Sequence, residues 1–398
     1  MSMTITFLDG SAGDAVDHQG LSLIVARLMT EGAGEYDAQS FRARMRDLAM
    51  SISASASRDA MTVTLQTPKR AMNEAAELLR LALYEACFDE ADIDRVRAEQ
   101  LSRLRNSLKD PDWIASRIML SQIYGSDHPY ALNSGGTLSS LRSISRGDIV
   151  RRYQQVVTDS KTHIAIVGDI GLEDAAAWID QVMGPAGAFD RSVPAPVFPE
   201  GKRFTHAHDG PQTSLRLIWP APAKGDDDYA ASIVLAHILG GGFGSRLMEE
   251  LREERGLTYG VSARVMSMRA AGRLIVSGAT SHNNVGAFLG ETRRIIHDIL
   301  TQGISQEELE KAKSYMIGSH ALGLTSTGRI SSALVGLQLY QLPPTHLDDW
   351  LEDVAAVTMG DMNVVIQAIL GVSPVTIAVG DTQDGDEWQE IKDVPNVE

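Results

Sequence analysis

Two stretches of the chain, THIAIVGDI (162–170) and VTIAVGD (375–381), share a β-branched run that closes on Gly-Asp, and their aspartates are 212 residues apart. Three further pairs of segments have nearly the same offset. They are FDEADIDRVRAEQL (88–101) with ISQEELEKAKSYMI (304–317), SISRGDIVRRY (143–153) with AVTMGDMNVVI (356–366), and GLSLIVARLMTEGAG (20–34) with SIVLAHILGGGFG (232–244). Four matches in the same order indicate an internal duplication with halves of about 200 residues, far above the periods of solenoid repeats.

Each half has the same predicted order of strands and helices and ends in a closing strand. Alternating polarity in DAMTVTLQT (59–67) and AAGRLIVSGAT (270–280) predicts a mostly antiparallel sheet with helices packed on one face, an α+β fold. The proline-containing segment GPAGAFDRSVPAPVFPEGKR (184–203) lacks apolar periodicity and is typical of a linker. We therefore predict an N-terminal domain over 1–185, a linker over 186–203 and a C-terminal domain over 204–398.

Composition excludes several classes of protein. The formal charge is −16 over 398 residues, without a Lys/Arg-rich run, which argues against nucleic acid or an anionic membrane as a partner. No apolar stretch reaches the roughly 18–20 residues of a membrane span. Cys87 is the only cysteine, so we expect no disulfide or CxxC site and interpret it as a small core residue. The first residues resemble a strand rather than a secretory signal, which fits a periplasmic protein if a leader has been removed and a cytoplasmic one otherwise.

Short motifs, read alone, favour structural roles. His206 and His208 are the only closely spaced histidines, and a solvated strand entry is favoured there over a two-ligand metal site. The run GGGFG (240–244) lacks the Lys and the spacing of a phosphate loop, so a tight turn with close backbone approach is favoured. Arg252 is typical of a helix surface, and Tyr259 of a strand core.

The run ILGGGFGSRLMEELREERGLTYGV (238–261) resembles the second domain of the M16 (pitrilysin/insulinase) peptidases, in their two-subunit bacterial M16B class. The resemblance extends over nearly the whole chain and includes FDEADIDRVRAEQ (88–100) and YGSDHPYALNSGGT (124–137). It implies two homologous domains of the LuxS/MPP-like metallohydrolase fold. It also implies that two chains close around an unfolded peptide, each forming half of the chamber.

Active members of this family carry HxxEH, with two zinc ligands and a general base, and a later glutamate ligand. The corresponding positions here are Leu23, Ala26, Arg27 and about Arg103. Leucine and alanine offer no lone pair and arginine is a permanent cation, so none of these side chains can take the family role. The resemblance therefore implies no metal or other cofactor in this chain and zinc in a partner subunit that carries HxxEH.

The family's other catalytic groups are an arginine and a tyrosine seven residues apart, the spacing of Arg252 and Tyr259. The resemblance assigns both to stabilisation of the oxyanion. Gly240, Gly241 and Gly242 are expected to let an extended peptide approach as an added strand. We therefore predict that the chain is the zinc-lacking subunit of a heterodimeric peptidase that acts on unfolded peptides. Two alternatives are a proteolytically silent structural or chaperone-like relative, and a free-standing enzyme with a metal site at His206 and His208.

Overall fold

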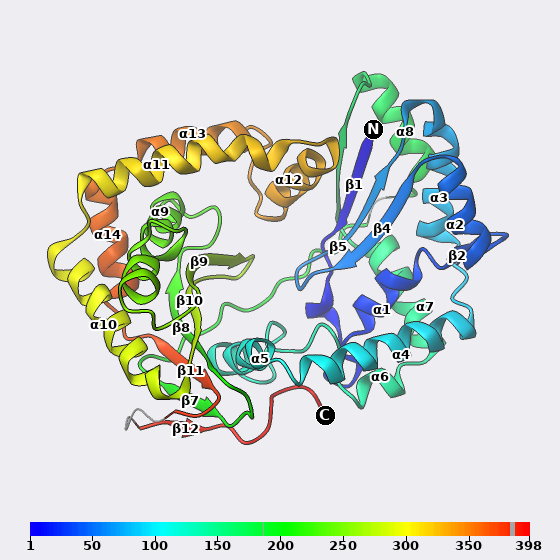
Figure 1. Ribbon diagram of the computed structural model, residues 1–398. Helices are drawn as coiled ribbons and strands as arrows, with labels where there is room; N and C mark the ends of the chain where they lie inside the picture. Colours follow the sequence, from blue (N-terminus) through cyan, green and yellow to red (C-terminus); the bar gives the residue numbers. More distant parts are fainter. Residues whose placement is uncertain (186, 383–386) are drawn as a thin grey trace.

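The computed structural model describes residues 1–185, 187–382 and 387–398. It contains two large sheets, each with its own set of helices, and a small two-stranded sheet in the first half (Figure 1). Residue 186, where the predicted linker begins, lies outside the described residues. The elements of the first half are β1 (Ser2–Phe7), α1 (Leu21–Leu28), β2 (Gly32–Ala33), β3 (Tyr36–Asp37), α2 (Ala38–Asp47), β4 (Ser51–Ala56), β5 (Met61–Gln66), α3 (Met72–Tyr84), α4 (Glu90–Ser107), α5 (Pro111–Tyr124), α6 (Ser140–Ser143), α7 (Arg146–Gln154), β6 (Thr162–Val167) and α8 (Leu172–Val182).

Over the described residues, the second half repeats most of this order, without counterparts of β2, β3, α2 and α8 and with the additional strands β7 and β12. Its elements are β7 (Arg203–His206), β8 (Thr213–Ala221), α9 (Tyr229–Gly240), β9 (Val261–Met268), β10 (Ala271–Thr280), α10 (Val285–Gln302), α11 (Gln306–His320), α12 (Thr327–Leu339), α13 (His346–Ala356), α14 (Met359–Leu370), β11 (Val375–Val379) and β12 (Gln389–Glu390). The four matched sequence pairs fall on α1 with α9, α4 with α11, α7 with α14, and β6 with β11.

The two large sheets share one topology. The first has the order β4-β5-β1-β6, and the second contains the equivalent order β9-β10-β8-β11, with every one of these neighbours antiparallel. Strands β7 and β12 extend the second sheet beyond β11, and both of their pairings are parallel. The mostly antiparallel prediction therefore holds, with parallel pairing added at one edge.

Reciprocal capping boxes start the equivalent helices α7 and α14. Ser145 and Asp148 form the box in α7, and Thr358 and Asp361 form the box in α14. In each case the hydroxyl accepts from the backbone N–H three residues on, and the carboxylate accepts from the cap N–H. These local signals explain why the repeat was visible in the sequence.

Each of the two large sheets is covered on both faces, so the prediction of helices on one face is incomplete. Helices of the same half pack on one face, whereas the other face receives a helix from the opposite half. Helix α5 lies against β8 and β11, and α12 lies against β1 and β6 (Figure 1). An apolar helix face does not specify which sheet it covers, and the sequence therefore did not show this exchange.

The two exchanged contacts differ in chemistry. On α5, Ile114 and Ile118 are buried in a cluster with Ile218, Ile275 and Ile377 of the second sheet. On α12, the Ser331 hydroxyl lies 2.9 Å from the Ser2 hydroxyl and 2.8 Å from the Thr4 hydroxyl of β1. The α5 contact is therefore an apolar core, and the α12 contact includes a buried hydroxyl cluster.

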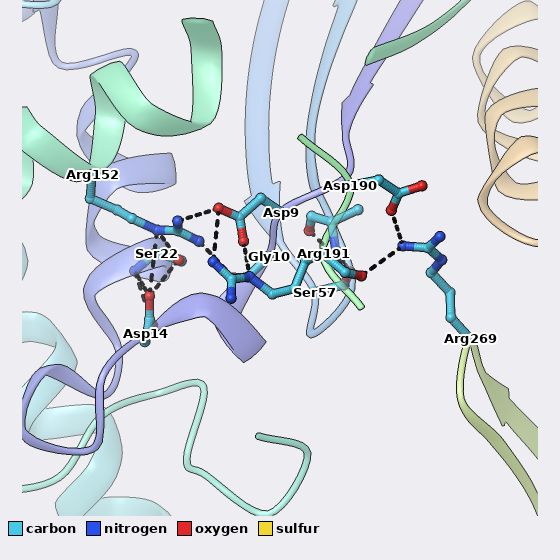
Figure 2. A network of polar contacts seen from close by, with 10 residues as sticks. Asp9, Gly10, Asp14, Ser22, Ser57, Arg152, Asp190, Arg191 and Arg269 are labelled. Carbon is cyan, nitrogen blue, oxygen red and sulfur yellow. Dashed lines mark hydrogen bonds and ion pairs between the residues drawn. The ribbon is translucent and has the colours of Figure 1, made fainter. Parts of the chain in front are cut away.

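The segment between α8 and β7 is fixed to both halves. Phe189 exchanges backbone hydrogen bonds with Asp159 (2.8 Å) and Lys161 (2.7 Å) of the first half. Asp190 pairs with Arg269 of the β9–β10 turn at 2.7 Å (Figure 2). Over these residues the predicted linker is therefore held to the first half by backbone hydrogen bonds and to the second half by an ion pair.

A network of polar side chains continues from this linker segment into the first half (Figure 2). Arg191 and Arg152 both pair with the carboxylate of Asp9, each at 2.5 Å. Arg152 also donates to Ser22, whose backbone and hydroxyl donate to Asp14. Burial raises the pKa of Asp14 to about 6. The two arginines compensate the buried carboxylate of Asp9, as buried charges require.

No single helix in the described ranges is long and apolar enough to cross a membrane. By length and composition alone, one pair passes when taken together, His346–Ala356 with Met359–Leu370, which is bent by 95°.

Candidate functional site

The predicted Arg–Tyr pair lies on the segment that leads into edge strand β9. Arg252 belongs to a π-helical stretch, Met248–Glu254, and Gly256 adopts a left-handed conformation, with φ +60°, between this stretch and Tyr259. The Tyr259 side chain is 90% exposed, and its hydroxyl has no hydrogen-bond partner within the described part of the chain. The interpretation of Tyr259 as a core residue is therefore wrong.

Arg252 is held mainly by an aromatic ring. Its guanidinium carbon lies 5.2 Å from the centroid of the Phe243 ring, and Nη1 lies 3.5 Å from the Glu253 carboxylate. A cation over a ring is stabilised without using all of its N–H donors. Arg252 is thus oriented while donors remain for another molecule.

The glycine turn is needed for packing within the chain. A Cβ atom on Gly240 would lie 2.4 Å from the Ala263 nitrogen of β9, and one on Gly241 would lie 2.5 Å from the His237 backbone. Gly242 has more room, because the nearest atom to its Cβ position, on His237, is 3.9 Å away. The predicted close approach is therefore made, at Gly240 and Gly241, to the chain's own strand and helix.

A pocket of about 570 Å³ opens beside this turn, between the end of α9 and α11. The rings of His237 and Tyr315 stack in it, with centroids 4.7 Å apart and 18° between their planes. Burial lowers the pKa of His237. Arg246 pairs with Glu308 through two contacts of 2.6 and 2.9 Å, and this pairing lowers the pKa of the Glu308 carboxyl to about 2. Sequence reasoning missed Phe243 and Tyr315; the only signal was a phenylalanine inside a glycine run.

The equivalent region of the first half lies where α1 crosses α4. Ala26 is buried and Leu23 is half-buried, whereas Arg27 reaches α4. Arg27 forms an ion pair with Glu99 and donates to the Gln100 amide at 3.3 Å. The α4 residues that face Arg27 are thus Glu99 and Gln100, one turn before the predicted position.

Arg103, the predicted position of the third ligand, is exposed. A zinc ion does not fit the side chains at the aligned positions, because Arg27 offers only donors and a positive charge. In the ranges that the structure describes, no three His, Cys, Asp or Glu side chains are placed to hold a metal ion.

The remaining candidate residues are His206, His208 and Cys87, whose environment is formed by the chain itself. His206 bonds through Nδ1 to the Ile391 carbonyl at 2.8 Å, beside β12. The Nδ1 atom of His208 is buried and has no partner among the described residues. Cys87 is only half-buried, with its sulfur 3.7 Å from the Gly34 carbonyl, and burial raises the pKa of its thiol. It is therefore less enclosed than the core residue we expected.

Comparisons with known proteins agree with the motif-based resemblance. The family model for insulinase (peptidase family M16) matches residues 2–128, and the model for the peptidase M16 inactive domain matches residues 143–316. A Helicobacter pylori protein named non-peptidase homolog YmxG is 25% identical over 386 residues, which cover 94% of this chain and 87% of the relative.

Two further relatives cover most of the chain. A Bacillus subtilis protein named uncharacterized zinc protease YmxG is 23% identical, over 89% of this chain and 86% of the relative. A crystal structure described as the peptidase M16 inactive domain from Pseudomonas fluorescens is 26% identical, with a TM-score of 0.89 over 98% of this chain and 94% of that one. The two family models together span most of the sequence, and the chain belongs to the M16 peptidase family, as a relative that combines the insulinase-like N-terminal region with the M16 inactive domain.

Proposed function

We propose that this chain is the zinc-lacking subunit of a two-chain M16 peptidase and supplies Arg252 and Tyr259 to an active centre whose HxxEH motif lies on the partner. The exposure of the Tyr259 side chain is the observation that carries the proposal. A ring that is 90% exposed contributes little to the core, so its hydroxyl is free to bind another molecule.

The two side chains suit one chemical task. When a peptide carbonyl is attacked, negative charge develops on its oxygen, and oriented donors stabilise that charge. The Tyr259 hydroxyl donates one proton and the Arg252 guanidinium donates several in a planar fork. Because the Arg252 guanidinium lies over the Phe243 ring, its position is already fixed before a peptide binds.

A second candidate is a proteolytically silent relative with a structural or chaperone-like role. It is supported by the name of the Helicobacter pylori relative and by the ion pair with Glu99 that Arg27, at an aligned zinc position, forms within the chain. This candidate predicts that the Arg252 and Tyr259 side chains make no difference to any peptidase activity of a complex.

The test is reconstitution with an HxxEH-containing M16 subunit from the same genome, followed by peptide cleavage. We expect Tyr259→Phe and Arg252→Lys each to lower kcat by about 10²–10³, as loss of one oxyanion donor does. Arg255→Lys is the matched control, because Arg255 lies in the same segment and pairs with Glu291 at 3.1 Å. Full activity of the double variant would refute the catalytic role and favour the silent relative.

A further inference from the structure

We infer that the pocket beside the glycine turn binds a large apolar or aromatic side chain of the peptide, and that Phe243 and Tyr315 determine this preference. The inference rests on the proposed function, since it names the substrate class of the same site. Its first support is geometric. The pocket has a volume of about 570 Å³, and its lining includes His237, Phe243, Ala312 and Tyr315. That volume lies within the range of pockets that enclose small organic groups.

Two of these aromatic rings remain in contact with water. The Phe243 side chain is 76% exposed and the Tyr315 side chain is 61% exposed. Single exposed apolar residues are common on protein surfaces, but rings that converge on one pocket indicate a binding surface. An apolar side chain that enters the pocket removes both its own surface and these rings from water.

The charges of the pocket favour a neutral occupant. Arg246 is paired with Glu308, and Lys311 is paired with Glu307 at 2.6 Å. Burial lowers the pKa of His237, so its imidazole is neutral at pH 7. Glu249 also lines the pocket and disfavours an acidic side chain. A phenylalanine or leucine side chain therefore fits better than an aspartate or glutamate.

Phe243 connects the pocket to the candidate catalytic arginine. Its ring lines the pocket and also holds the Arg252 guanidinium at 5.2 Å. A side chain bound against Phe243 therefore places its own peptide backbone close to Arg252. The pocket would select a residue that flanks the bond on which Arg252 acts.

The duplication relates this pocket to the region of the first half that carries the aligned zinc positions. When the repeats are aligned on Gly34 with Gly244 and on Phe88 with Ile304, Arg27 corresponds to His237 and Glu99 corresponds to Tyr315. Both pairs are in contact in the structure. The pocket therefore lies at the second half's counterpart of the α1–α4 crossing, where the ion pair of the first half is replaced by an uncharged stack.

The test measures peptide binding to the purified full chain without a partner. Four fluorescein-labelled pentapeptides differ only in a central Phe, Leu, Ala or Glu, and binding is followed by fluorescence anisotropy. We expect the Phe and Leu peptides to bind at least tenfold more tightly than the Ala and Glu peptides, because a larger apolar side chain removes more apolar surface from water. Tyr315→Ala and Phe243→Ala should remove that preference, whereas Tyr315→Phe should retain it because the ring remains.

Leu322→Ala is the control, since Leu322 is exposed and does not line the pocket. The thermal midpoint of each variant shows whether it is folded. Equal affinity for the four peptides, absence of binding by the Phe peptide, or an unchanged preference in folded Tyr315→Ala would overturn the inference. Because no catalysis is required, an inactive reconstituted complex would count against the proposed function and leave this result separate.

Discussion

Replacement of Ile118 by alanine tests whether helix α5 of the first half is part of the core of the second. Ile118 is fully buried against the second sheet. The substitution removes three carbon atoms, which at about 0.8 kcal/mol for each buried group gives about 2.4 kcal/mol. The remaining cavity adds to this loss, and we expect the free energy of unfolding to fall by about 3–4 kcal/mol, within the range for such replacements.

The assay is urea unfolding followed by circular dichroism and tryptophan fluorescence. Trp178 is buried in the first half and Trp219 in the second, so fluorescence reports on both. Because α5 belongs to one half by sequence and to the other by packing, the transitions of both should shift. Leu172→Ala is the control: Leu172 is 88% exposed, and its loss should change stability by no more than about 0.5 kcal/mol. A loss below about 1 kcal/mol for Ile118→Ala would refute the packing of α5 on the second sheet.

Three further predictions concern single side chains. Folding raises the pKa of Asp14 from 3.8 to about 6, so its contribution to stability is fully present only below pH 3.8 and is lost as pH rises through 6. Asp14→Asn should remove this pH dependence, which is about 2 kcal/mol between pH 4 and pH 7 and is measured by urea unfolding at these two values. Arg27→Ala leaves the buried Gln100 with one partner fewer and should lower the free energy of unfolding by about 1 kcal/mol in the same assay, whereas no change would show that the contact is not stabilising. Tyr259→Phe should leave the thermal midpoint unchanged, because the ring is exposed; a clear fall would indicate a structural role.

Much of the fold could be predicted because its signals are local. A Ser or Thr cap with an acidic residue three positions later marks α7 and α14 in the sequence as clearly as in the structure. The exchange of α5 and α12 could not be predicted, because Ile118 on an apolar helix face gives no information about which sheet it covers. The ion pair between Asp190 and Arg269 joins residues 79 positions apart and leaves no sequence pattern.

For the candidate site, too, the sequence indicated the local features and not those that depend on residues far apart in the chain. The spacing of Arg252 and Tyr259 is local, and the structure places both on the segment that leads into β9. The count to Arg103 runs through several loops, and the residue that faces Arg27 is Glu99 instead. The pocket could not be predicted, because its lining residues come from α9, the glycine turn and α11, and α11 is distant from the other two in the sequence.

The two halves show how one helix crossing can have different uses after duplication. In the first half the crossing of α1 and α4 carries Arg27 and Glu99, and a partly buried cation there requires a carboxylate beside it. That pairing fills the space between the helices with charged groups that satisfy each other. In the second half His237 and Tyr315 occupy the same places, and neither ring requires a charged partner. The stack leaves apolar surface open to water beside Phe243, and apolar surface that is not covered by its own chain is the kind that a peptide side chain covers. The ion pair at the first crossing thus connects two helices of the chain, whereas the uncharged stack at the second leaves apolar surface for the peptide side chain that we infer to bind there.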